Sequence, residues 1–301
     1  MPPIPPPATQ GRIPFQGHDT WYRITGGEQA SLPPLVILHG GPGALHDYTL
    51  RFAHLASPAR AVIHYDQLGC GRSTHLPDAP ADFWTPALFL AELDNLLAHL
   101  GIADRYHLLG QSWGGMLAAE HAIRQPTGLR GLVIANSPPS MELWVQEANR
   151  LRQALPPDIQ ATLLRHEAAG TTSSPEYEAA TLAFYARHVC RIQPFPEEVA
   201  ASFAGIAADP TVYHTMNGPS EFHCTGSLKT WNIIKDVSKI TAPTLLLSGR
   251  HDEATHAVVQ PFYDNIPNAA WHIFGHSSHM PHVEETTTCM AVIAAFLAGQ
   301  D

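Results

Sequence analysis

Short runs of consecutive aliphatic residues recur along the chain, separated by longer stretches in which apolar positions return every three or four residues. Continuous apolar runs are typical of strands buried on both faces, and the longer spacing is typical of helices with one apolar face. The pattern therefore predicts an α/β fold, with a mostly parallel sheet and helices on both faces. We expect a hairpin at 12–25, strands at 35–39, 61–65, 106–110, 131–135, 244–248 and 270–274, and helices at 47–56, 86–100, 114–124, 256–263 and 285–298.

The strand pattern lapses between about residues 137 and 241, where amphipathic helical patterns replace it. Because strands resume at residue 243, these helices form an insertion rather than a separate C-terminal domain. We predict a core domain formed by residues 1–136 and 242–301 and an inserted helical cap formed by residues 137–241. A cap over the carboxyl ends of the strands encloses a site and excludes water from it. The predicted cap helices are 141–154, 158–169, 175–191 and 197–204.

The amino-acid composition of the chain limits the classes of partner and cofactor that we expect. The chain has 301 residues, 45% of them hydrophobic, which allows a substantial core. Its 17 Lys and Arg against 27 Asp and Glu give a net charge of −10, which argues against nucleic acid as a partner. No apolar run reaches the roughly 18 residues that a membrane span needs. The 19 histidines show no metal-binding spacing, so we expect no metal and no cofactor.

The N-terminal residues and the cysteines indicate the cellular compartment of the protein. The opening stretch, MPPIPPPATQGR, has neither the basic nor the apolar region of a secretion signal. The four cysteines are widely scattered and form no C-x-x-C pair, which suits a reducing compartment better than a disulfide framework. We therefore expect a cytoplasmic protein. The sequence leaves its oligomeric state open.

The most informative motif is a G-x-S-x-G pentapeptide at residues 110–114, with Ser112 at its centre. It directly follows an apolar strand and precedes a helical pattern, which is the context that a nucleophile elbow requires. In such an elbow a strand turns sharply into a helix, so that the serine hydroxyl is lifted clear of the sheet. The motif predicts the α/β-hydrolase fold with Ser112 as nucleophile.

A serine nucleophile needs a base, and the base needs an orienting acid. In this fold the acid and the histidine follow the serine in that order. The loop after strand 244–248 offers Asp252 and Glu253, and the loop after strand 270–274 offers His276, His279 and His282. We assign Asp252 as the acid and His279 as the base, with the neighbouring residues as alternatives.

A second glycine-rich motif, LHGGPG, ends the first parallel strand at residues 38–43. Glycines let a loop approach closely enough to aim backbone N–H groups at a developing oxyanion. The expected donors are the N–H groups of Gly41 and of Trp113, the residue after the nucleophile.

With these residues in place, the chain resembles the proline iminopeptidase family of serine α/β-hydrolases, which includes tricorn-interacting aminopeptidases and bacterial L-amino acid amidases. The resemblance spans nearly the whole chain. It rests on the motifs HGGPG (39–43), YDQLGCGRS (65–73), GQSWGG (110–115), MNGPSEF (216–222), GRHDE (249–253) and SSHMPHVE (277–284). Pro281 and His282 depart from the bulkier residues that family members often carry there, which leaves the shape of the pocket open.

The resemblance implies that Glu221 and Glu253 hold the free α-amino group of the substrate. The chemistry agrees, because an ammonium group in a partly dry pocket needs carboxylates to offset its desolvation. We therefore expect a cofactor-free serine hydrolase that removes an N-terminal residue, preferably proline, from a peptide or hydrolyses an amino acid amide. Two alternatives remain: an esterase or lactonase with the same triad, and a non-catalytic receptor on the hydrolase scaffold.

Overall fold

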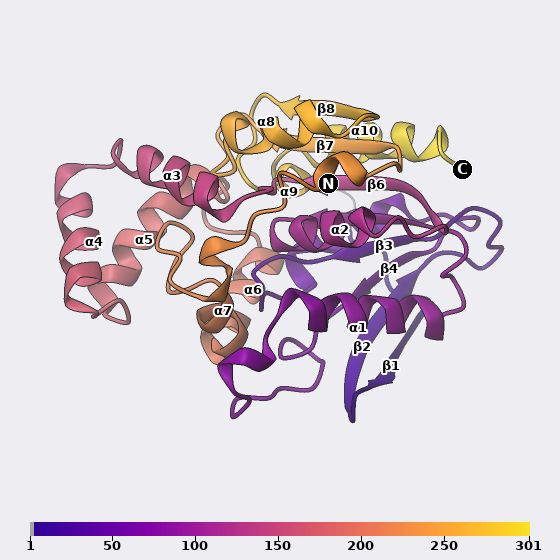
Figure 1. The fold of residues 1–301 in the computed structure, drawn as a ribbon, viewed down its shortest axis with the longest axis horizontal. Helices are drawn as coiled ribbons and strands as arrows, with labels where there is room; N and C mark the ends of the chain where they lie inside the picture. The colour runs from indigo at the N-terminus through magenta and orange to yellow at the C-terminus, as the bar shows by residue number, and fades with distance from the viewer. Residues whose placement is uncertain (1–2) are drawn as a thin grey trace.

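An eight-stranded sheet forms the centre of the computed structural model, which describes residues 3–301 (Figure 1). The strand order is β1-β2-β4-β3-β5-β6-β7-β8. β1 pairs with β2, and β2 with β4, in antiparallel fashion, and every other neighbouring pair is parallel. The predicted hairpin and mostly parallel sheet are therefore confirmed. The strands are β1 (Thr9–Phe15), β2 (His18–Thr25), β3 (Leu35–Leu38), β4 (Val62–Tyr65), β5 (Tyr106–Gln111), β6 (Leu129–Ala135), β7 (Thr244–Gly249) and β8 (Ala269–Phe274).

Helices cover both faces of the sheet, because alternate strand residues point to opposite sides. In β3, Val36 and Leu38 join an apolar cluster with α1, α2 and α8, whereas Leu35 and Ile37 join another with η1 and α10. The α/β prediction is thus confirmed, although the first helix has 3-10 geometry. These covering helices are η1 (Asp47–Leu55), α1 (Pro86–His99), α2 (Trp113–Ile123), α8 (His256–Asn265) and α10 (Thr286–Ala298).

Local sequence signals explain where these helices begin and end. The Thr85 hydroxyl accepts a hydrogen bond from the Leu88 backbone N–H, and Pro86 occupies the first turn, where its missing N–H costs nothing. Gly101 follows the helix with φ of 66°, a conformation that glycine adopts without strain. The chain therefore leaves α1 sharply and returns to the sheet as β5.

Five α-helices follow β6 and precede β7, and they gather beyond one end of the sheet (Figure 1). Their apolar cluster includes Leu163, Tyr177 and Phe184 and extends to the core residues Tyr48 and Met280. We propose that residues 137–241 form the cap and that the remaining residues form the core domain. The cap helices are α3 (Met141–Arg152), α4 (Pro157–Ala169), α5 (Pro175–His188), α6 (Glu197–Ala208) and α7 (Thr211–Met216), followed by the short turns η3 (Ser227–Thr230) and η4 (Val237–Lys239).

The sequence pattern missed the shortest elements. Helix α7 has only six residues, too few for apolar periodicity to repeat. The turns η2 (Ala81–Phe83) and α9 (Pro281–Glu284) are shorter still. Within residues 3–301, no helix combines the length and the apolar composition that crossing a membrane requires.

Candidate active site

Ser112 occupies a strained turn between β5 and α2. Its φ of 57° and ψ of −125° are unusual for a residue with a β-carbon, and such strain is characteristic of nucleophile elbows. The flanking glycines make the turn feasible: a β-carbon on Gly110 would lie 2.0 Å from the Gly114 carbonyl oxygen, and one on Gly114 would lie 2.1 Å from the Leu38 carbonyl oxygen. The sequence therefore folds locally into the strand-turn-helix that presents this serine.

Asp252 and His279 lie together in the loops that follow β7 and β8. His279 Nδ1 lies 2.7 Å from Asp252 Oδ1, and both residues are buried. The same carboxylate accepts hydrogen bonds from the Ala254 backbone N–H at 2.8 Å and the Asn136 side-chain amide at 2.5 Å. Because these donors fix the carboxylate, Asp252 can hold the imidazole in one tautomer and orientation.

The other two candidate histidines are placed differently. His276 is exposed, and its backbone N–H donates to Glu285. His282 is buried, with Nε2 2.9 Å from the Tyr48 carbonyl oxygen, and its ring stacks on Phe52. His279, in contrast, lines the same cavity as Ser112. The structure thus brings His279, rather than its neighbours, to the serine and Asp252.

The glycine-rich loop after β3 passes close to the nucleophile. A β-carbon on Gly40 would lie 2.9 Å from Ser112 Cβ, and Gly41, with φ of 110°, lines the cavity beside Ser112. Trp113 begins α2, and its indole N–H donates to Gln67 at 2.9 Å. The two proposed oxyanion donors, Gly41 and Trp113, therefore flank Ser112.

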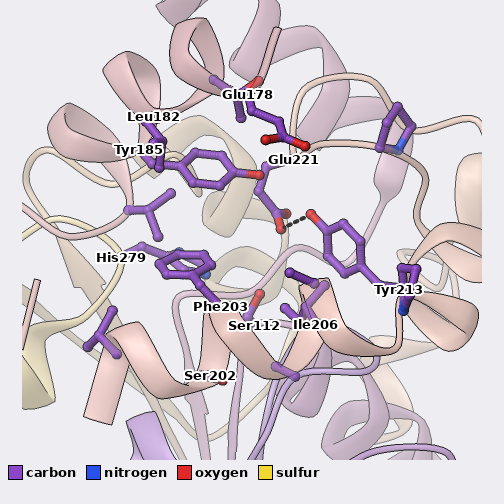
Figure 2. Close-up of a pocket in the computed structure, with 18 of the residues that line it drawn as sticks. Ser112, Glu178, Leu182, Tyr185, Ser202, Phe203, Ile206, Tyr213, Glu221 and His279 are labelled. Atoms are coloured by element: carbon purple, nitrogen blue, oxygen red, sulfur yellow. Dashed lines mark hydrogen bonds between the residues drawn. The ribbon is translucent and has the colours of Figure 1, made fainter. Parts of the chain in front are cut away.

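Two carboxylates line the same cavity: Glu221, which is half-buried (Figure 2), and Glu253, which is buried. The Tyr213 hydroxyl of α7 donates to Glu221 Oε1 at 2.6 Å. Glu253 Oε1 lies 3.8 Å from His279 Nε2, yet neither Glu253 oxygen has a hydrogen-bond partner among the described residues. A buried carboxylate without a donor is costly, so Glu253 is free to accept hydrogen bonds from a group that enters the cavity.

The surroundings of both carboxylates raise their pKa values. Burial raises the pKa of Glu253 well above its usual range, and the nearby charges of Glu221 and Asp252 raise it further. Burial also raises the pKa of Glu221, although the Tyr213 hydroxyl and the positive form of His279 oppose that shift. A cation bound between the carboxylates reverses these shifts, because it favours the charged forms.

The raised pKa of Glu253 predicts a pH-dependent stability. The folded protein holds this proton up to a higher pH than the unfolded chain, whose glutamates have a pKa near 4.3, so stability is lost as pH rises through that window. Glu253→Gln is therefore expected to raise Tm at pH 8.5 by roughly 3 °C and to leave it nearly unchanged at about pH 3.5, where the folded and the unfolded chain both hold the proton. Scanning calorimetry of both proteins without substrate measures this, and an equal shift at the two pH values would contradict it.

The cavity beside Ser112 has a volume of about 410 Å³. Leu182 and Tyr185 of α5 and Phe203 and Ile206 of α6 form much of its wall (Figure 2). A narrower recess adjoins it at Ser112 and Glu221 and is lined by Trp113, Met116, Met141, Trp144 and Leu228. Ser112 therefore lies where the large cavity and the narrow recess meet.

By residue type, six aromatic side chains of the elbow and the cap are candidates to line the pocket, and the structure divides them. Tyr185 lines the large cavity, and Trp113 and Trp144 line the narrow recess. The remaining three are Phe222, buried in the apolar cluster of the cap, Phe195, packed on Phe203, and Trp231, whose indole donates to Glu120. The sequence missed Tyr213, Phe203 and Ile206, which no motif marks.

Known proteins resemble this chain along nearly its whole length. Residues 33–286 match the family model described as alpha/beta hydrolase fold. A proline iminopeptidase of Clostridium botulinum is 38% identical over 97% of this chain and 99% of its own length. This chain belongs to the proline iminopeptidase family. Two crystal structures have closely similar folds. VinJ is 54% identical, with 98% of this chain and 100% of its own chain covered and a TM-score of 0.96. The proline iminopeptidase of Mycobacterium smegmatis is 52% identical, with 97% of this chain and 98% of its own chain covered and a TM-score of 0.90.

No three His, Cys, Asp or Glu side chains between residues 3 and 301 are grouped so as to hold a metal ion.

Proposed function

We propose that this protein is a serine aminopeptidase or amino acid amidase that cleaves the amide bond after a free N-terminal residue, preferably proline. The observation that carries the proposal is the pair of carboxylates, the half-buried Glu221 and the buried Glu253, in the cavity that also holds Ser112 and His279. An N-terminal ammonium group is the cation that such a pair suits. Its relatives' names agree with this substrate class.

In the proposed reaction, Ser112 Oγ attacks the carbonyl carbon of the N-terminal residue while His279 Nε2 takes the serine proton. The tetrahedral intermediate collapses, the C–N bond breaks, and His279 delivers the proton to the leaving amine. Water then attacks the acyl-enzyme with the same base and releases the amino acid. Asp252 stabilises the imidazolium through the 2.7 Å contact with Nδ1.

The N–H groups of Gly41 and Trp113 are proposed to bind the oxyanion. Each such donor typically contributes about 3 kcal/mol of transition-state stabilisation. Glu221, oriented by Tyr213, and Glu253, whose oxygens have no hydrogen-bond partner within residues 3–301, are proposed to hold the ammonium group. A blocked amine leaves these carboxylates facing each other without a cation, so N-acylated substrates are disfavoured.

Activity-based labelling distinguishes this function from its rivals. A fluorophosphonate probe is expected to label wild-type protein at Ser112 and to leave Ser112→Ala unlabelled; absence of labelling would favour a non-catalytic receptor. Parallel assays with L-prolinamide and a p-nitrophenyl ester then separate amidase from esterase. Rapid ester cleavage without any amide turnover would move the assignment to the esterase or lactonase alternative.

The charges in the cavity predict a preference for uncharged leaving groups. The lining contains Glu178, Glu221 and Glu253, and none of the described residues that line it is a lysine or an arginine. The carboxylate of a bound dipeptide therefore meets negative charge at close range. We expect kcat/KM for prolyl-leucinamide to exceed that for prolyl-leucine about tenfold or more. Equal values at low and high salt would contradict this prediction.

The size of the substrate, the partners, the location and the lack of a cofactor are also proposals. The substrate is expected to be a small peptide or an amino acid amide, with neither nucleic acid nor membrane as a partner. A cytoplasmic location and the absence of a cofactor are likewise predicted by the sequence alone.

A further inference from the structure

Tyr48 lies in η1, outside every motif quoted above, yet its side chain lines the cavity that holds Ser112. Its hydroxyl accepts a hydrogen bond from the Gly40 backbone N–H at 2.7 Å and donates one to Gln111 Oε1. A β-carbon on Gly40 would lie 2.6 Å from the Tyr48 hydroxyl oxygen and 2.9 Å from Ser112 Cβ. The hydroxyl and the nucleophile therefore lie on the same side of the oxyanion loop.

Gln111 extends this connection to the base. Its side-chain nitrogen, Nε2, donates to the His279 backbone carbonyl at 2.9 Å. Three hydrogen bonds in series thus join the oxyanion loop at Gly40, the nucleophile strand at Gln111 and the base loop at His279, and every residue in the series is buried. A buried series of hydrogen bonds holds its members at fixed separations.

Tyr48 is itself fixed from the opposite side. His282 Nε2 lies 2.9 Å from the Tyr48 carbonyl oxygen, and because a carbonyl only accepts, Nε2 carries the proton. The His282 ring stacks on Phe52 with 4.6 Å between centroids. Burial lowers the pKa of His282 to about 3, so it stays a neutral donor across the working pH range. His282 therefore supports Tyr48 and takes no part in proton transfer.

We propose that Tyr48 is a positioning residue that sets the spacing between the oxyanion donors, Ser112 and His279. This role rests on the proposed function, because it concerns the same triad. Tyr48 acts through Gly40 and Gln111, so it contributes to the alignment of the transition state and not to the recognition of the amine, which the carboxylates provide. Misplacement of reacting groups by about 1 Å lowers rates by roughly 100-fold.

The test is Tyr48→Phe, which removes the hydroxyl and keeps the ring. We expect kcat for L-prolinamide to fall roughly 10- to 100-fold while KM stays within threefold. Affinity for L-prolinal, an aldehyde that forms a tetrahedral adduct with the serine, should fall in parallel with kcat. Affinity for the product L-proline, and the preference for free over acetylated amines, should not change.

Tyr106→Phe is the matched control. Tyr106 is also buried, lies on β5 and shares a hydrogen bond with His121 Nε2 at 2.5 Å. Both variants should lose some thermal stability, but only Tyr48→Phe should lose kcat and prolinal affinity. A folded Tyr48→Phe protein whose kcat stays within twofold of wild type, or whose loss lies in KM alone, overturns the proposal.

Gln111→Met tests the positioning role of Tyr48 if Tyr48→Phe does not fold. It interrupts the same series, so it should reproduce the loss of kcat and prolinal affinity, and unchanged values overturn the role of Tyr48. The kcat of the double variant should be little lower than that of the poorer single variant, because both substitutions interrupt the same series of hydrogen bonds. Wild-type protein inactive on L-prolinamide would contradict the proposed function instead, so the two failures are distinguishable.

Discussion

Ser112→Ala is expected to reduce kcat/KM for L-prolinamide by at least about 10⁴-fold. The hydroxyl is the atom that forms the acyl-enzyme, and the strained turn at φ of 57° holds it at the cavity where His279 also lies. Without it, only binding and the oxyanion donors remain, and these give a small residual rate. Steady-state kinetics with amine detection measures the loss, and near-UV circular dichroism checks that the variant is folded.

His279→Ala provides the companion measurement. Its loss should be similar to that of Ser112→Ala, and the double variant should be no worse than either single one, because nucleophile and base act together. Ser112→Ala protein that keeps more than about a hundredth of wild-type activity, or a double variant whose losses multiply, would contradict the assigned mechanism.

The second large effect concerns the amine. Glu221→Gln and Glu253→Gln each keep the shape of the side chain and remove its charge. We expect kcat/KM for L-prolinamide to fall about 100-fold in each variant, because truncating one partner of a buried charge pair typically costs 2–5 kcal/mol. Hydrolysis of N-acetyl-L-prolinamide should change little, since that substrate brings no ammonium group. The quantity to compare is the ratio of kcat/KM for the two substrates.

Glu178→Gln is the control for this pair. Glu178 lines the same cavity but is exposed, so its charge is screened by water and the expected change is less than about threefold. An equal loss for free and acetylated substrates in the Glu221 and Glu253 variants would mean that these carboxylates support the structure and do not select the amine.

Most of the sheet could be predicted from the sequence because its signals are local. Each buried strand is a continuous apolar run, and the elbow is a short motif between such a run and a helix. Asp252 and His279 follow from the order of the strands, since the carboxyl ends of parallel strands meet at one edge. Spacing alone does not distinguish His276, His279 and His282, because it does not show which of the three rings lies beside Asp252 and the cavity.

The roles of Tyr213 and Tyr48 could not be predicted in the same way. Tyr213 lies on the six-residue cap helix α7 and Tyr48 on the 3-10 helix η1 of the core, and neither belongs to a motif. Their contacts with Glu221 and Gln111 depend on how distant segments pack. Likewise, Phe222 and Trp231 looked like pocket walls by residue type, whereas packing buried one in the cap and turned the other toward Glu120.

The most direct test of this account is the ratio of kcat/KM for L-prolinamide to that for N-acetyl-L-prolinamide, measured with wild-type protein and with Ser112→Ala as the blank. If Glu221 and Glu253 hold the ammonium group, the ratio should be at least about 100 in favour of the free amine. A ratio near one, with amide turnover that still depends on Ser112, would contradict the central claim that Glu221 and Glu253 select a free N-terminal amine.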